Sequence, residues 1–158
     1  MKPKKFTPTY STLAMLMASP TEPMPEFMRR HHITLMTNAL NAIVSGTDAS
    51  QNDWRIICDG INMLESLVQA GLMADEHDTI LLAVKAMHAA AMRSQQGKGI
   101  RLDGPGIQVI RGILMDYQTA IESLSHRDMV SCHRDAERRA WEIRNGKRKL
   151  HDVVVVAL

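Results

Sequence analysis

Aromatic side chains are scarce in this sequence, and their scarcity limits how its core can be built. They make up 4% of the 158 residues, whereas methionine occurs 12 times. The core must therefore be filled by aliphatic side chains and by methionine, which fills irregular gaps but specifies packing weakly. The chain is long enough for one domain with a core of its own.

Cysteine is rare as well, and long apolar runs are missing. Cys58 and Cys132 stand alone, outside any Cys-X-X-Cys motif, which favours packed thiols in a reducing compartment over a disulfide scaffold. No apolar run approaches the ~20 residues that span a bilayer. The basic start leads into "LAMLMAS", which is too short for a cleavable signal. We therefore expect a cytoplasmic protein with no membrane contact.

The glycine-rich loops of nucleotide-binding enzymes are also missing. The segment "DGPG" at 103–106 precedes apolar residues at helical spacing, with Asp103 or Gly104 suited to the N-cap and Pro105 to the first turn. A phosphate loop would need a pattern such as GxGxxG after a strand. We interpret "DGPG" as a helix start and keep ligand binding as the less favoured alternative. No cofactor is expected.

Apolar residues recur at steps of three and four along most of the chain, which predicts an all-α fold. We expect a single-domain bundle of about five helices. Their predicted extents are 25–45, 53–71, 75 to about 95, about 104–124 and 125–145. The apolar stripe of the helix predicted from residue 75 includes His88, so we expect His88 to lie in the core. Gly60 lies inside the 53–71 helix, and its missing side chain predicts a close approach of a second helix. The domain divides into an N-terminal arm with a short helix (1–24), the bundle (25–149) and a C-terminal strand (150–158).

The chain ends in "HDVVVVAL", which is too apolar for a free tail and predicts a minor C-terminal β element. Residues 100–102 are its nearest candidate partner in the chain. A two-stranded ribbon is marginal by itself, so a second chain could complete it. The candidate dimer contacts are Val153, Val154, Val155 and Val156.

Positive charge concentrates near the C-terminus. The formal net charge is +2, but residues 126–158 hold 8 Lys or Arg against 5 Asp or Glu. Such a stripe could bind phosphates, although interleaved acidic residues favour a solvated face with internal ion pairs. The candidate contacts with nucleic acid or another partner are Arg134, Arg138, Arg139, Arg144, Lys147, Arg148 and Lys149.

Histidines supply the only hint of metal or acid–base chemistry. His126 and His133 lie seven residues apart and share a helix face, with Glu137 four residues further on. This spacing matches no strong zinc motif, so a capped helix with internal ion pairs is favoured. We predict no metal site and no catalytic residue.

Four segments, "LMASPTEPMPEFM", "RLDGPGIQVIRGIL", "CHRDAE" and "HDVVVV", resemble small uncharacterised proteins carried by proteobacterial phages, plasmids and other mobile elements. The similarity covers most of the chain. It implies expression in a bacterial cytoplasm and an accessory role in a mobile element, and it supplies no catalytic residues.

Taken together, the sequence predicts a non-enzymatic interaction protein, an accessory or host-modulating factor of a mobile element that binds a protein partner. The first alternative is a nucleic-acid-binding helical module that uses the basic C-terminal helix. The second is a small enzyme or metal protein built around His126 and His133.

The valine segment generates a testable prediction. We expect a homodimer, because an unpaired strand edge can pair with a second chain. Truncation after Lys149 should give a monomer, or an insoluble chain if the strand also completes the core. Light scattering on the full chain and on the truncated chain measures the molar mass of each in solution. A full chain that is monomeric at about 100 μM, where even a micromolar dimer is mostly formed, would contradict the dimer.

Overall fold

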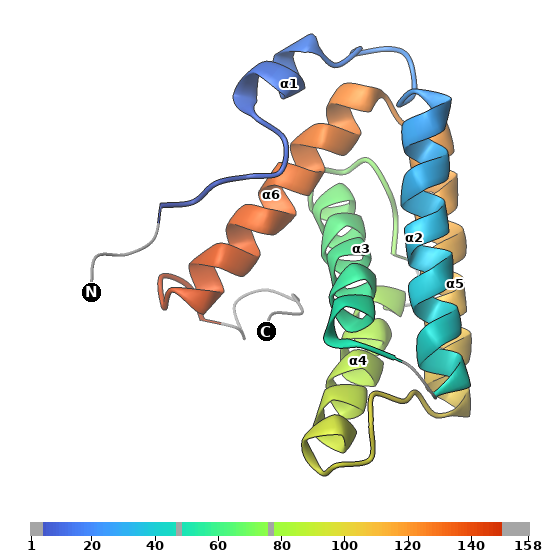
Figure 1. Cartoon of the computed structure of the whole chain (residues 1–158). Coiled ribbons are helices and arrows are strands. Elements are labelled where there is room, and N and C mark those ends of the chain that lie inside the picture. The colour runs from blue at the N-terminus through green and yellow to red at the C-terminus, as the bar shows by residue number, and fades with distance from the viewer. Residues whose placement is uncertain (1–4, 47–48, 76–77, 150–158) are drawn as a thin grey trace.

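The computed structural model describes residues 5–46, 49–75 and 78–149, and regular structure in these ranges is helical (Figure 1). The helices are α1 (Thr12–Met17), α2 (Glu26–Ser45), α3 (Gln51–Gln69), α4 (Thr79–Gln95), α5 (Gly104–Ser123) and α6 (His126–Arg144). The predicted all-α bundle is confirmed for this part of the chain, with five long helices and the short one expected in the arm. None of the described helices is both long enough and apolar enough to traverse a bilayer.

Helix α3 lies at the centre of the bundle. It packs against α2, α4, α5 and α6, and its apolar face is inaccessible to solvent at Ile57, Ile61, Leu64 and Leu67. Helix α5 completes the layer by packing on α2 and α4, whereas α1 contacts α6. Helix α6 runs obliquely past α3 at one side of the bundle (Figure 1). Removing this α3 face from water favours the arrangement, because apolar burial is the dominant favourable term in folding.

Side-chain caps explain where several helices begin. The Asp103 carboxylate accepts a hydrogen bond from the Gly106 N–H at 2.8 Å, which confirms "DGPG" as a helix start. A Cβ at Gly106 would lie 2.8 Å from Asp103 Oδ1, so glycine leaves room for this cap. Ser50 and Asp53 form a reciprocal capping box at α3, which satisfies two backbone donors that the helix leaves unpaired.

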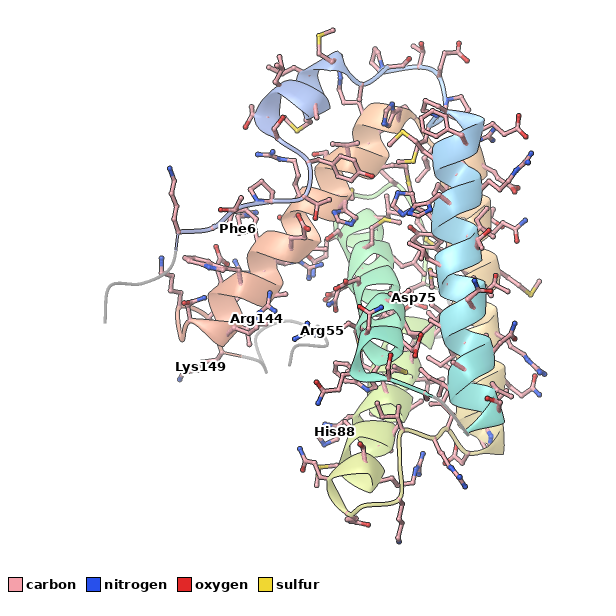
Figure 2. The ribbon with its side chains drawn as sticks, in the orientation of Figure 1. Phe6, Arg55, Asp75, His88, Arg144 and Lys149 are labelled. Carbon is pink, nitrogen blue, oxygen red and sulfur yellow. The ribbon has the colours of Figure 1, made fainter. Side chains whose placement is uncertain are left out.

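Helix α4 begins and packs differently from the prediction. Asp75 lies before the helix, but its carboxylate accepts hydrogen bonds from the N–H groups of Thr79 and Ile80 at 2.7 and 3.2 Å. The prediction that His88 lies in the core is wrong, because His88 is exposed (Figure 2). The buried row is instead Ile80, Ala83, Met87 and Ala90. Small alanines on this row let the neighbouring helices approach closely and turn the larger Leu81, Leu82 and Met92 outward.

The close helix contact predicted at Gly60 is confirmed. A Cβ at this position would lie 2.6 Å from Met36 Cε, which is far inside van der Waals contact. The missing side chain therefore lets the buried Met36 of α2 pack against the backbone of α3.

The minor β element is not shown. Residues 100–102 have no strand conformation, although Ile100 is buried and Leu102 packs on the core. The predicted partner, Val153–Val156, lies outside the described residues. Within the described ranges, β pairing is limited to an isolated antiparallel bridge between Pro23 and Ser125.

A buried charged network joins α6 to α3. The side chain of Arg139 is 2% exposed, and its guanidinium donates to Glu65, to the Asn62 carbonyl at 3.0 Å and to Ser66 Oγ at 2.7 Å. Its Nε lies 3.2 Å from Asp135 Oδ2. Arg139 is therefore a structural residue, not a surface contact for phosphates, which corrects its place in the basic stripe.

Removing this guanidinium should destabilise the fold strongly. We expect Arg139→Met to lower the free energy of unfolding by about 3–5 kcal/mol, because the buried Glu65 loses its compensating charge. The matched control is Arg138→Met, since Arg138 is 54% exposed and pairs with Asp135 on the same helix. It should cost about 0–1 kcal/mol. Urea unfolding of both variants measures the difference, and equal costs would contradict the structural role.

Candidate functional site

The N-terminal arm is fastened across α6 by arginines that point toward it. Arg127 donates to the carbonyls of Ala18 and Leu16 at 3.1 and 3.0 Å. Arg134 donates to the Tyr10 carbonyl and to Thr12 Oγ1 at 3.1 Å. Both guanidinium groups donate hydrogen bonds to the arm. Arg134, a candidate contact with nucleic acid or another partner, is therefore engaged within the chain.

Internal contacts also engage most of the other basic candidates. Arg138 pairs with Asp135, and Arg148 Nε lies 3.1 Å from Glu142 Oε2. The Lys147 ammonium lies 4.2 Å from the centre of the Trp141 ring, in the range of a cation–π contact. Arg144 and Lys149 are exposed and are labelled in Figure 2. The expected basic stripe is therefore largely divided among ion pairs, the arm and the core.

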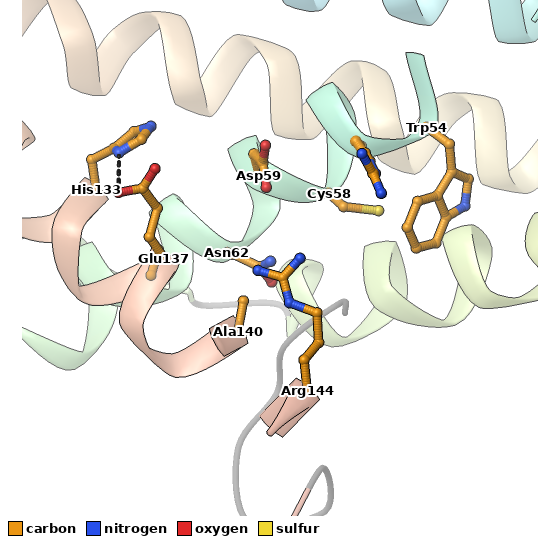
Figure 3. A pocket seen from close by; sticks show the side chains of 10 residues that line it. Trp54, Cys58, Asp59, Asn62, His133, Glu137, Ala140 and Arg144 are labelled. Carbon is orange, nitrogen blue, oxygen red and sulfur yellow. Dashed lines mark ion pairs between the residues drawn. The ribbon is translucent and has the colours of Figure 1, made fainter. Parts of the chain in front are cut away.

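A polar cavity lies between α3 and α6 (Figure 3). Its volume is about 230 Å³, and side chains from the two helices line it at helical spacing. Helix α3 contributes Trp54, Arg55, Cys58, Asp59 and Asn62, and helix α6 contributes His133, Ala136, Glu137, Ala140 and Arg144. The cavity thus gathers both signs of charge in one place.

Glu137 is the better satisfied of the two cavity carboxylates. It accepts hydrogen bonds from the Thr9 N–H at 3.0 Å and from the Thr9 hydroxyl. Burial acts to raise the pKa of Glu137, but His133 and the Thr9 hydrogen bonds outweigh it and lower that pKa. His133 Nδ1 lies 3.7 Å from Glu137 Oε2. This distance is within the range of an ion pair but too long for a hydrogen bond.

Asp59 has a different environment from Glu137. Asp59 is exposed by its solvent-accessible area, but enough protein atoms surround its carboxylate that desolvation raises its pKa. His133, Arg144 and Arg55 oppose that shift. The charged form of Asp59 is therefore the one that gains from a nearby cation.

Cys58 lines the cavity but is not an activated nucleophile. Burial raises the pKa of its thiol well above the ordinary value, and Asp59 adds to that shift. Nucleophilic cysteines need a thiolate and hence a lowered pKa. Cys58 therefore supplies apolar surface to the cavity and not an activated thiolate.

A second arrangement of polar rings lies beside the cavity. Tyr10 Oη and His32 Nε2 are 3.1 Å apart, and the Tyr10 ring meets the His133 ring edge-on with centroids 5.2 Å apart. The arm thus reaches both α2 and α6 through one tyrosine.

The structure brings His133 and Glu137 together as the sequence predicts, but His126 is not part of the cavity. Within the described ranges, no cluster of His, Cys, Asp or Glu side chains has the arrangement of a metal site. The prediction placed no residue of α3 in a functional site, and therefore missed Arg55 and Asp59. The sequence shows that Arg55 and Asp59 are four residues apart and therefore share a helix face. Nothing in the sequence indicates that this face of α3 meets α6.

Helix α1 presents a third feature, an outward apolar face. Leu13, Leu16 and Met17 are 68%, 60% and 78% exposed, and Phe27 at the start of α2 is 75% exposed. Helix α1 buries none of its residues, and the whole stretch 6–21 carries no charged side chain. We refer to Leu13, Leu16 and Met17 as the α1 apolar face.

No protein-family model, curated protein or solved structure matches this chain. The functional inference accordingly depends on the geometry of the α1 apolar face and of the cavity.

The environment of His32 predicts a pH-dependent stability. Burial, and then the neighbouring His133 and His31, lower the pKa of His32 to about 4. The unfolded chain binds this proton near pH 6.5, so protonation favours unfolding and stability falls as the pH drops from about 6.5 to about 4. Burial lowers the pKa of His126 as well, which adds to the same trend.

Replacing His32 with glutamine should reduce this pH dependence. Urea unfolding at pH 7 and pH 5 gives the loss of unfolding free energy for each protein. We expect a smaller loss in His32→Gln than in the unaltered chain, whereas the control His88→Gln, which removes an exposed imidazole, should keep the full loss. An identical loss in all three proteins would contradict the assignment.

Proposed function

We propose that this chain is a non-enzymatic interaction protein that binds a protein partner through the α1 apolar face. One observation carries the proposal. Helix α1 is attached to α6 by polar contacts from Arg127 and Arg134, while Leu13, Leu16 and Met17 point into solvent. A surface helix ordinarily turns its large apolar side chains toward the core, whereas in α1 only Met15 is partly buried.

The attachment makes this orientation a stable property of the fold. A helix of six residues is far too short to persist by itself in water. Helix α1 gains its order from the Ser11 cap and from the two arginines of α6, which bind the Leu16, Ala18 and Tyr10 carbonyls. These contacts use backbone acceptors and leave the large apolar side chains free. The fold thereby presents a preorganised apolar ridge, which lowers the entropy cost of binding.

The shape of the ridge favours an apolar groove on another protein as the binding partner. Its side chains stand at positions i, i+3 and i+4 of one convex helix, which is the pattern of helix-in-groove recognition. A flat symmetric contact between two copies needs about 800 Å² from each partner, more than a helix of two turns supplies. The absence of charge along 6–21 fits a groove that is apolar throughout.

The biological role that we propose is an accessory or host-modulating function in a bacterial mobile element. The similarity of four segments to mobile-element proteins supports it. Internal contacts also support protein binding over nucleic-acid binding, because they engage basic side chains that would otherwise contact phosphates. These side chains are Arg134, Arg138, Arg139 and Arg148.

Polar substitutions on the ridge should abolish partner binding without unfolding the chain. We expect Leu16→Gln with Met17→Gln to weaken binding at least tenfold, because burying each such side chain contributes about 1.5–3 kcal/mol. The matched control is Met115→Gln on α5, since Met115 is 70% exposed and lies on another helix. A partner isolated from the native bacterium is titrated against all three proteins, with thermal unfolding as the check on folding.

Three outcomes would contradict the proposal. Equal binding by the ridge variant and the unaltered chain would place the interface elsewhere. Ridge-dependent binding to phosphatidylglycerol–phosphatidylethanolamine vesicles would indicate a membrane surface as the target. Ridge-dependent self-association in light scattering would indicate a second copy of the chain.

A further inference from the structure

The α3–α6 cavity has no part in the proposed interaction, yet it contains charged side chains that make no hydrogen bond within the described part of the chain. Arg55 from α3 and Arg144 from α6 both line it, and Figure 3 shows the Arg144 guanidinium directed into it. In the described part of the chain, neither guanidinium has a hydrogen bond or a close ion pair, although both interact electrostatically with Asp59. Two arginines facing one cavity from different helices are suited to anionic groups, because guanidinium binds carboxylates in a fixed planar geometry.

Asp59 supplies the opposite charge in the same cavity. It lines the same cavity as His133, Glu137 and the two arginines (Figure 3). Within the described part of the chain it accepts no hydrogen bond and makes no close ion pair, although its carboxylate senses Arg144, Arg55 and His133 electrostatically. Glu137, by contrast, is already satisfied by Thr9 and His133. The charged lining groups that make no hydrogen bond within the described part of the chain are therefore two cations and one anion.

These three groups define the ligand that would complement them. Two guanidiniums call for two carboxylates, and a carboxylate set apart from them calls for a cationic donor. We propose that the α3–α6 cavity binds an acidic α-amino acid, with its two carboxylates on Arg55 and Arg144 and its ammonium group on Asp59. The net charge of such a ligand, −1, balances the net charge of the three side chains.

The size and the remaining lining agree with a ligand of this class. A volume of about 230 Å³ exceeds the space of one or two waters and falls below the ~300–1,000 Å³ of drug-sized sites. Trp54, Ala136 and Ala140 add apolar surface against which the ligand's methylene groups can pack. Asp59 would also gain, because burial alone raises its pKa and an ammonium partner favours its charged form.

Binding can be measured on the full chain with two probes and two comparators. The probes are L-glutamate and L-aspartate. Glutarate lacks the ammonium group, and L-alanine lacks the second carboxylate. Isothermal titration calorimetry should show saturable binding of at least one probe, and at least tenfold weaker binding of both comparators, because a hydrogen bond to a charged group contributes about 1.5–3 kcal/mol.

Trp54 provides an independent readout at the cavity itself. The chain has two tryptophans, so Trp141→Phe leaves Trp54 as the sole indole, and phenylalanine keeps an aromatic ring beside Phe6. The fluorescence of this variant should change along the same binding curve that calorimetry gives for the unaltered chain.

Substitutions then test each assigned contact. Asp59→Asn should weaken L-glutamate binding about tenfold and remove the preference over glutarate, because only the ammonium contact is lost. Arg55→Gln and Arg144→Gln should each weaken binding of L-glutamate and glutarate alike by a similar factor. The control is Arg111→Gln, an exposed arginine of α5 outside the cavity, which should bind as the unaltered chain does.

Several results would overturn the assignment. These are no saturable binding of either probe at about 10 mM, a concentration that detects even millimolar affinity, equal binding of L-glutamate and glutarate, or an effect of Arg111→Gln as large as that of Arg144→Gln. The interaction proposal does not depend on this site, since its test uses residues of α1 alone.

Discussion

The buried guanidinium of Arg139 is the interaction on which both candidate surfaces depend. It fixes α6 against α3 through Glu65, Ser66 and the Asn62 carbonyl. The cavity exists because these two helices are held at that crossing, and the arm is positioned because α6 presents Arg127 and Arg134 to it. A buried charge of this kind contributes less to net stability than apolar packing would, but it restricts α6 to an orientation in which its donors meet specific acceptors.

Polar contacts attach α6 to the rest of the bundle, although few of its residues are hydrophobic. Its buried apolar residues are few, namely Met129, Val130, Cys132 and Ala136. Much of its remaining attachment is polar: arginines bind carbonyls, carboxylates and hydroxyls, and Glu137 accepts hydrogen bonds from Thr9. Such contacts are directional, whereas apolar burial is not. Directional contacts therefore hold the arm across α6, while Leu13, Leu16 and Met17 face solvent.

The helices could be predicted from sequence because their signals are local. Ser11, Ser50, Asp103 and Ser125 cap helices within three residues of themselves, and Gly46 ends α2 in the left-handed conformation that glycine favours. The buried face of α4 could not be predicted, because alanines occur all around it and either face could have packed. The inward turn of Arg139 was also out of reach, since its partners Glu65 and Ser66 lie more than 70 residues away.

The cavity, too, depends on contacts between helices that the sequence does not predict. Arg55 and Asp59 share a face of α3, and Glu137 and Arg144 share a face of α6. Helical periodicity predicts each pair, but the choice of which two faces meet is a tertiary property.

The contact between the arm and α6 also constrains the order of events during synthesis. Thr9 and Glu137, which bond to each other, are separated by 128 residues. Chains emerge from the ribosome N-terminus first, at about 5–20 residues per second, so the α1 segment leaves the exit tunnel seconds before its anchor exists. Throughout that interval its leucines and methionines are unrestrained and accessible to chaperones, and the arm docks only after the last helix has been made.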